Sequence, residues 1–253
     1  MDASHPTAAP QPGWRIRRLA MTPSTNTVAL DAAAAGEPEG LVVVAAHQTA
    51  GRGRLGRTWS APPGSALLVS VLLRPPPSVV HLAVTAVGCA AAAGCARVSG
   101  YEPGLKWPND LVADDRKLGG ILAETSGNVA AVVVGLGLNV RPVADRPEPL
   151  RAVAVDLEDL ARTPVDQDGL LAAILEELAT RYQQLKTDGP DELLAEYRRR
   201  CVTIGREVRV EQPDKTLTGV AVDIARDGSL TLEERWGGRV RVDVGDVVHV
   251  RPA

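Results

Sequence analysis

Several residue types are scarce in this chain of 253 residues, and each scarcity excludes a class of protein. Phenylalanine is absent, and the chain has only three cysteines and four histidines. An odd number of cysteines without a Cys-x-x-Cys pair argues against a disulfide framework or a zinc site and favours a reducing, cytoplasmic setting. The net charge of −3 provides no overall basic surface for nucleic acid, although a local basic patch is still compatible with it.

Lysine is also rare, which makes its positions informative. Only four of the 28 basic residues are lysines: Lys106, Lys117, Lys186 and Lys215. We attribute the excess of arginine to the composition of the source genome. A lysine that persists against this bias indicates a position where lysine is needed.

The sequence predicts neither a signal peptide nor a membrane span. Residues 1–13 are rich in proline and alanine and lack the basic and apolar regions of a signal peptide, so we expect a disordered tail. Residues 79–96 carry no formal charge over a length that could cross a membrane. Because alanine, glycine and other small residues dominate this run, we expect a buried helix that Ser78 caps.

Apolar patterning and turn signals predict a mixed α/β region. We expect helices at residues 24–35, 168–186 and 191–201, with Ser24 and Thr25 as caps of the first. We expect strands at residues 41–46, 66–73, 105–112 (broken at Pro108), 118–125 and 129–140, the last two joined as a hairpin by residues 126–128. Irregular structure is expected at residues 48–59 and 141–149.

The pattern changes after Cys201. Short runs in which valine, isoleucine or leucine alternates with polar residues follow one another, with turn signals between them. About 50 residues of this kind are typical of a small all-β barrel or sandwich. The predicted organisation is therefore a tail at 1–13, a mixed α/β domain at 14–201 and a small β domain at 202–253.

A basic glycine loop follows the strand at 41–46. Residues 51–56, Gly-Arg-Gly-Arg-Leu-Gly, match the dinucleotide-binding pattern G-x-G-x-x-G, and 51–58 nearly match the P-loop pattern. Both patterns must open a helix, whereas the sequence continues into Ala-Pro-Pro-Gly at 61–64. We expect a loop in which Arg52, Arg54 and Arg57 repel one another until they bind an anion. A solvated loop or a non-specific nucleic-acid contact remains an alternative.

A second cluster combines several kinds of chemistry in a few residues. Residues 106–110, Lys-Trp-Pro-Asn-Asp, contain a cation, an aromatic ring, an amide and a carboxylate. Lys117 follows and leads into Gly119 and Gly120, and glycines next to a lysine in a strand indicate that the backbone makes room for a ligand. Residues 135–139 again place glycines in an apolar strand that ends in an amide.

Taken together, these motifs resemble those of the biotin–protein ligases. The resemblance rests on five elements in the family's order: Ser24-Thr25-Asn26; Gln48 to Arg54 with Gly56, Arg57 and Trp59; Lys106 to Asp110; Lys117 to Leu122; and Gly135 to Asn139. It covers nearly the whole chain, because the family also ends in a small SH3-like β domain. Each motif alone is weak, whereas all five in order are specific.

The resemblance implies a fold, a reaction and a partner. The fold is an α/β (α+β) domain like the catalytic domain of class II aminoacyl-tRNA synthetases, followed by the SH3-like β-barrel. Biotin and ATP, with Mg²⁺, give biotinyl-5′-adenylate and pyrophosphate. A lysine amine of a biotin carboxyl carrier domain of a carboxylase then attacks the adenylate, which gives an amide and AMP. We expect neither a nucleic-acid nor a membrane partner, and the oligomeric state stays open.

The resemblance also implies roles for individual residues. The biotin site would comprise Ser24, Thr25, Asn26, Gln48, Gly51, Arg52, Gly53, Arg54, Lys117, Gly120 and Gly135. The ATP and adenylate site would comprise Arg54, Arg57, Trp59, Lys106, Asn109, Asp110, Lys117 and Asn139. Arg54, Lys117 and Asp110 would be catalytic, and Asp110 is the predicted magnesium ligand. Adenylation of an ionised carboxylate needs no general base but needs cations where two anions meet, which Lys117 and Arg54 supply.

Other interpretations of the same residues stay open at this stage. Ser24 and Thr25 can serve only as helix caps, and Trp59 and Trp107 only as core residues. A lipoate or octanoate ligase would share the fold, although lipoate has no urea for the Ser-Thr-Asn triplet to bind. A biotin-sensing DNA-binding regulator is disfavoured, because 23 residues before Ser24 are too few for a helix-turn-helix module. Residues 140–160 contain no tryptophan to cover adenine.

Overall fold

A seven-stranded sheet forms the centre of the larger part of the molecule. The computed structural model describes residues 13–125, 131–212, 214–243 and 245–249. The strand order is β1 (Arg15–Thr22), β2 (Leu41–Gln48), β5 (Ala66–Leu73), β9 (Val132–Asn139), β8 (Arg116–Thr125), β7 (Asp110–Ala113) and β6 (Gly104–Lys106). β1 and β2 are parallel, and every other neighbouring pair is antiparallel.

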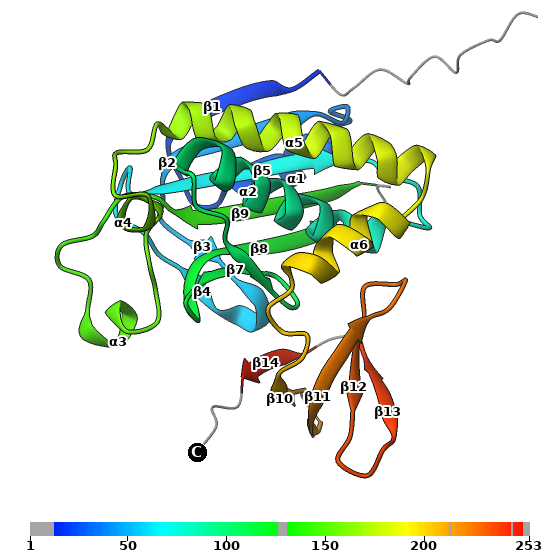
Figure 1. The fold of residues 1–253 in the computed structure, drawn as a ribbon. Coiled ribbons are helices and arrows are strands. Elements are labelled where there is room, and N and C mark those ends of the chain that lie inside the picture. Colours follow the sequence, from blue (N-terminus) through cyan, green and yellow to red (C-terminus); the bar gives the residue numbers. More distant parts are fainter. Residues whose placement is uncertain (1–12, 126–130, 213, 244, 250–253) are drawn as a thin grey trace, which may run out of the picture.

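Helices cover both faces of this sheet (Figure 1). α1 (Thr25–Ala34) packs its alanines on one face against Val43 and Leu72, whereas α2 (Ala83–Ser99), α5 (Gln167–Thr187) and α6 (Asp191–Arg200) lie on the other. All eight residues of β5 are buried, as a strand between two helical layers requires. Two short helices, α3 (Glu148–Arg151) and α4 (Leu157–Ala161), lie in the connection to α5.

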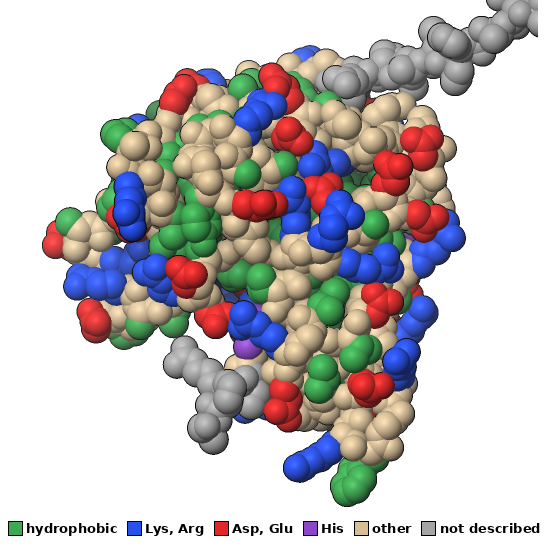
Figure 2. Space-filling view, in the orientation of Figure 1, with side chains coloured by type: hydrophobic (Ala, Val, Ile, Leu, Met, Phe, Trp, Pro, Cys, Tyr) green, Lys and Arg blue, Asp and Glu red, His purple; other side chains and the backbone are tan. Residues whose placement is uncertain are grey.

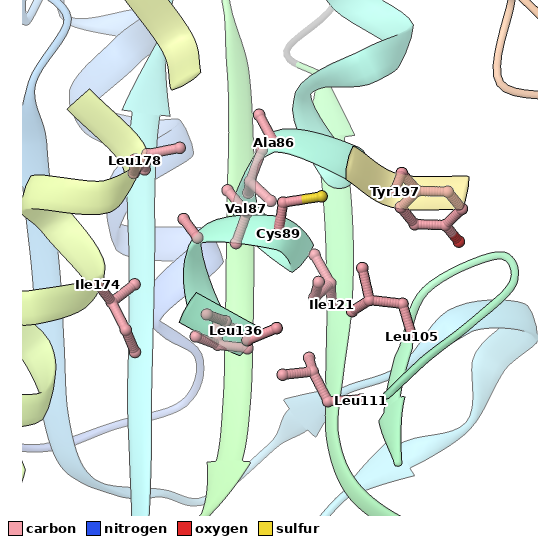
Figure 3. Close-up of a cluster of buried hydrophobic side chains, with 14 of the residues drawn as sticks. Ala86, Val87, Cys89, Leu105, Leu111, Ile121, Leu136, Ile174, Leu178 and Tyr197 are labelled. Carbon is pink, nitrogen blue, oxygen red and sulfur yellow. The ribbon is translucent and has the colours of Figure 1, made fainter. Parts of the chain in front are cut away.

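The uncharged run at 79–96 forms the buried helix that we expected. A helical segment from Val80 to Ser99 is long and apolar enough to cross a membrane by length and composition, but α2 is packed between the sheet and α5. Figure 3 shows Val87 and Cys89 of α2 among buried side chains of the sheet, of α5 and of α6. A Cβ on Gly94 would lie 2.6 Å from Ile174 Cγ1, so the small residues of α2 permit close packing against α5.

Several sequence-based assignments are wrong in detail. Ser78 does not cap α2, because a 3₁₀ turn at Val80–Leu82 precedes the helix and Leu82 is its N-cap residue. Residues 105–112 form two antiparallel strands rather than one, since the chain reverses at Pro108. Strand β1, whose side chains are mostly exposed, was not predicted. Neither were α3 and α4, nor the short pair β3 (Gly51–Arg52) and β4 (Thr58–Trp59) around the 3₁₀ turn Arg54–Gly56.

The hairpin of β8 and β9 is confirmed by their antiparallel pairing, and α1, α5 and α6 begin and end within one residue of their predicted limits. The buried helix expected at residues 79–96 instead runs from Ala83 to Ser99 as α2. The predicted hairpin turn at 126–128 and most of the predicted tail at 1–13 lie outside the described residues. All three cysteines are free and buried, and burial raises the pKa of Cys89 and Cys95 to about 12. These thiols therefore stay protonated at neutral pH, in line with a structural role.

A second, five-stranded antiparallel sheet follows α6, as the alternating pattern predicted. It contains β10 (Glu207–Glu211), β11 (Thr216–Ile224), β12 (Leu230–Glu233), β13 (Arg239–Val242) and β14 (Asp246–His249) in the order β13-β12-β11-β10-β14. Figure 1 shows it at one end of the larger domain. The SH3-like assignment and the boundary at 201/202 stay predictions.

Hydrogen bonds join the two parts of the chain. The Val202 amide donates to Leu105 O at 2.9 Å, the Trp107 amide donates to Thr203 Oγ1 at 3.1 Å, and Trp107 Nε1 donates to Gly228 O at 3.0 Å. Trp107 is buried, so its interpretation as a core residue is confirmed. Figure 2 shows basic and acidic side chains interspersed on the face in view. The second sheet is thereby anchored beside the Lys106–Asp110 segment.

His249 makes this junction sensitive to pH. Burial and the charges of Lys106 and Arg206 lower the pKa of His249 below 6.5, against the opposing effect of Asp115. Below that pH the unfolded chain binds a proton that the folded chain resists, so the free energy of unfolding falls as the pH decreases through 6.5. We expect the melting temperature to fall between pH 8 and pH 5, with a shallower slope in His249→Gln. His81→Gln, a substitution of an exposed histidine, serves as the control. If the melting temperature of His249→Gln depended on pH as steeply as that of the wild type, His249 would not be the cause of the pH dependence.

Candidate active site

A cavity of about 360 Å³ lies between the seven-stranded sheet, the basic glycine loop and β14. It brings together most of the residues that the sequence predicted to bind ligands. They are Ser24, Thr25, Asn26, Gln48, Arg52, Gly53, Arg54, Arg57, Trp59, Lys106, Asn109, Asp110, Lys117, Gly120 and Gly135. These residues come from five separate sequence motifs, so only the fold makes them neighbours.

One end of the cavity is lined by hydroxyl and amide groups, and the charges beside it, Arg52 and Glu124, are paired with each other. Ser24 precedes α1 in an extended conformation, but its side chain makes no capping hydrogen bond. Both the Thr25 amide and its hydroxyl donate to Gln48 Oε1, at 2.7 and 3.0 Å. Because Gln48 Oε1 is occupied, its Nε2 amino group is the atom that can donate to a ligand carbonyl.

Ser70 and Glu124 hold this end in place, and the sequence analysis missed both. Ser70 is fully buried in β5, and its hydroxyl lies 2.7 Å from Thr25 Oγ1 and 2.5 Å from Asn26 Oδ1. Asn26 Nδ2 donates to Glu124 Oε2 at 2.7 Å. Ser70 could have been found from the sequence, because it is a serine within the apolar run Ala66–Leu73 and a buried hydroxyl needs a hydrogen-bond partner.

Glycines in β8 and β9 form the floor of the cavity. A Cβ on Gly137 would lie 2.6 Å from the ring of Trp59, and one on Gly135 would collide with Asn26 Oδ1. A Cβ on Gly120 would lie 3.2 Å from Lys117 Nζ. Gly135 and Gly137 therefore need glycine for close approach by side chains of the site, and Gly120 gives Lys117 room. Trp59 covers the floor and also packs against the small buried cluster of Ala61, Ala66 and Leu68.

Lys117 lies at the other end of the cavity, where charged side chains gather. Its Nζ lies 2.7 Å from Asp110 Oδ1 and 5.9 Å from the centre of the Trp59 ring. Lys106 is half-buried nearby; burial lowers its pKa, Asp110 opposes this shift and Lys117 adds to it. Two lysines with one carboxylate leave a net positive charge, which suits an anionic ligand.

The arginines of the loop are paired, which corrects the expectation that they repel one another until an anion binds. Arg52 donates to both carboxylate oxygens of Glu124, at 3.0 and 2.9 Å. Arg57 forms an ion pair with Asp246, a residue of β14. Arg54 Nη1 donates to Asn109 Oδ1 at 3.2 Å and lies 4.0 Å from Asp246. Carboxylates from distant segments supply the counter-charge that the local sequence lacks.

Comparison with known proteins identifies the family of this chain. Residues 19–139 match the Biotin/lipoate A/B protein ligase family, and residues 203–250 match the Biotin protein ligase C terminal domain. The chain is 42% identical to the biotin--[acetyl-CoA-carboxylase] ligase of Mycobacterium tuberculosis over 94% of this chain and 91% of that protein. This chain belongs to the biotin protein ligase family.

Other similarities agree with this assignment to the biotin protein ligases. The bifunctional ligase/repressor BirA of Bacillus subtilis is 33% identical over 85% of this chain and 68% of its own length. The biotin protein ligase of Aquifex aeolicus, solved in complex with biotin and ATP, superposes with a TM-score of 0.82 at 24% identity. That match covers 94% of this chain and 99% of the other and supports the mixed α/β fold with its C-terminal antiparallel sheet.

Two predicted site residues of this biotin protein ligase do not line the cavity. Gly51 lies against the Trp59 backbone, so it permits the pairing of β3 and β4. Asn139 Nδ2 donates to Val155 O at 3.2 Å and to Lys117 O at 3.4 Å, and thereby joins the end of β9 to the segment after α3. Their contacts are structural here, and direct binding by either residue stays a prediction.

The second sheet contributes residues that sequence reasoning missed. Asp246, Val247 and Val248 of β14 and Glu211 of β10 line the cavity. Burial lowers the pKa of Arg54, and the carboxylates of Asp246 and Asp110 oppose this shift. No local pattern could connect Asp246 with Arg54, because about three quarters of the chain separates them.

The cavity does not fit a resident metal ion. Among the residues that the structure describes, no group of three or more His, Cys, Asp or Glu side chains could hold one. Asp110, the predicted magnesium ligand, is paired with Lys117. Asp110 is therefore not preset as a ligand of a protein-bound metal, and Mg²⁺ carried by ATP stays a prediction.

Proposed function

We propose that this chain is an ATP-dependent biotin–protein ligase that modifies a lysine of a biotin carboxyl carrier domain. The observation that supports it best is a single cavity with a neutral hydroxyl and amide end and a cationic end. Biotin has the matching shape, with a polar but uncharged urea at one end and a carboxylate at the other. The protein from Mycobacterium tuberculosis that it resembles is named for the same activity.

In the first step the neutral end binds the urea. Gln48 Nε2, Ser24 and Thr25 are placed for this role, with Asn26 as a wall held by Ser70 and Glu124. Backbone groups of Gly120 and Gly135, which line the cavity, are proposed to help hold the ring system. The preorganised hydrogen bonds reduce the entropic cost of ordering the site when biotin binds.

Adenylation then takes place at the charged end. The biotin carboxylate oxygen attacks the α-phosphorus of ATP, an O–P bond forms, and pyrophosphate leaves with the electrons of the broken P–O bond. Lys117 and Arg54 stabilise the charge where these two anions meet, and Asp110 orients Lys117. Asn109, Lys106, Arg57 and Trp59 are proposed to contact the nucleotide, whereas Arg52 and Gly53 close over biotin.

Amide formation is the second step. A carrier lysine amine attacks the acyl carbon of the adenylate, and AMP leaves with the electrons of the C–O bond. Asp110 is proposed to accept the proton that the attacking nitrogen loses. A carboxylase carrier domain is the expected partner, the cytoplasm is the expected compartment, and nothing here requires nucleic acid or a membrane.

ATP–pyrophosphate exchange tests this function directly. We expect exchange that depends on biotin and not on lipoate or octanoate, because only biotin presents a urea to Gln48 and the α1 N-terminus. Exchange with lipoate instead would move the activity to the lipoate ligases. Folded protein that supports no exchange with any of the three acids, with magnesium present, would refute the ligase assignment.

A further inference from the structure

A second cavity, of about 510 Å³, adjoins the first on the side of α2. Val84 and Thr85 of α2, Ala123 of β8 and Tyr197 of α6 form one side. The second sheet supplies the other side with Asp227 and Asp243. Nothing in the adenylation step uses this space.

The two cavities share a wall. Arg54, Asn109, Ile121 and Leu122 line both, together with the turn at Trp107 and Pro108. Asn109 is fixed in this wall because its Nδ2 donates to Ile121 O at 2.7 Å while its Oδ1 accepts from Arg54. A group that enters the second cavity therefore contacts Arg54 and Asn109, which also line the first cavity together with Lys117 and Asp110.

We propose that the second cavity is the channel through which the acceptor lysine of the carrier domain reaches the acyl adenylate. This inference rests on the proposed function. In the proposed reaction the first cavity holds biotin and the nucleotide at the same time, so an amine on another protein needs a separate way to the acyl carbon. A route beside Arg54 provides one without release of the adenylate.

The lining fits a lysine side chain. The apolar surfaces of Val84, Ile121, Leu122 and Ala123 suit its four methylene groups. Asp243 is exposed, and the Asp227 carboxylate accepts from the Ser229 amide at 3.0 Å and from its hydroxyl at 2.6 Å. Arg241 lies 3.4 Å from Asp227 and offsets part of its charge, which leaves Asp243 as the main attraction for an incoming ammonium group.

The transfer balances without any further reactant. The lysine ammonium group loses one proton to water before the attack, and its nitrogen then forms the C–N bond. The C–O bond to the phosphate breaks, and AMP takes the electron pair. The nitrogen loses its second proton to Asp110, as in the proposed second step.

The test separates transfer from adenylation with two variants. Thr85→Trp fills the cavity, and Asp243→Lys reverses the charge at its mouth. Three rates are measured in each: biotin-dependent ATP–pyrophosphate exchange, capture of the adenylate by hydroxylamine, and biotinylation of a recombinant biotin carboxyl carrier domain. Asp214→Lys, an exposed position in the connection between β10 and β11 and outside both cavities, is the matched charge control.

We expect both variants to keep exchange and hydroxylamine capture, because a small nucleophile does not need the channel. For the carrier domain, kcat/KM should fall about 100-fold in Thr85→Trp, because a displacement of the attacking amine by about 1 Å can lower the rate by about that factor. In Asp243→Lys, kcat/KM for the carrier domain should fall about tenfold, and salt should make this decrease smaller. In Asp214→Lys, kcat/KM for the carrier domain should remain unchanged.

Carrier biotinylation at the wild-type rate in Thr85→Trp would overturn the channel while leaving the ligase assignment intact. If Thr85→Trp fails to fold, the test rests on Asp243→Lys. Equal kcat/KM values for the carrier domain in Asp243→Lys and Asp214→Lys would then overturn the proposal. Absence of biotin-dependent exchange in the wild-type protein would instead refute the proposed function itself.

Discussion

Replacement of Lys117 by alanine should abolish most adenylate formation while the protein stays folded. The Lys117 ammonium group lies 2.7 Å from Asp110 and lines the cavity in which we propose that the biotin carboxylate meets the α-phosphate. Removal of such a preorganised charge typically lowers the rate by about 10²–10³-fold. Biotin-dependent ATP–pyrophosphate exchange measures this loss.

Stability should change little in this variant. The Lys117 side chain is 40% exposed, and an exposed ion pair contributes at most about 1 kcal/mol. Lys215→Ala, which removes an exposed lysine of the second sheet, is the matched control and should retain full exchange. Near-normal exchange in a folded Lys117→Ala protein would refute the catalytic assignment.

Gly135→Ala should have the second largest effect, and it should act on biotin rather than on ATP. The new Cβ would collide with Asn26 Oδ1, which accepts from the buried Ser70 hydroxyl. The collision displaces Asn26 from Ser70 and Glu124 and narrows the neutral end of the cavity. We expect the KM for biotin to rise about 100-fold, equivalent to the roughly 2–3 kcal/mol of a lost buried hydrogen-bond network.

Gly88→Ala provides the comparison for a generic change from glycine to alanine. Its Cβ would lie 3.3 Å from the end of the flexible Ile121 side chain, within α2 and away from Asn26. We expect its KM for biotin to stay within a few-fold of the wild-type value. Equal KM values for biotin in Gly135→Ala and the wild type would contradict the role of Asn26 as a cavity wall.

Sequence reasoning was most successful where one local pattern carried the information. The alanine-rich run at 79–96 predicted a buried helix, and the motifs Ser24–Asn26, Lys106–Asp110 and Lys117–Leu122 predicted residues that line one cavity. It failed at β1, because its exposed side chains carry no apolar pattern. It also failed at Ser78, because the 3₁₀ turn at Val80–Leu82 replaces a side-chain cap.

The sequence by itself determined the family, the order of the motifs and the types of chemical group at the site, since these depend on residue identity and spacing. Only the tertiary structure decided which charges meet. The pairing of Arg57 with Asp246, the bonds of Ser70 to Thr25 and Asn26, and the cavity beside Arg54 depend on contacts between segments far apart in the chain. A local pattern records propensity and periodicity, whereas such contacts arise from packing of the whole fold.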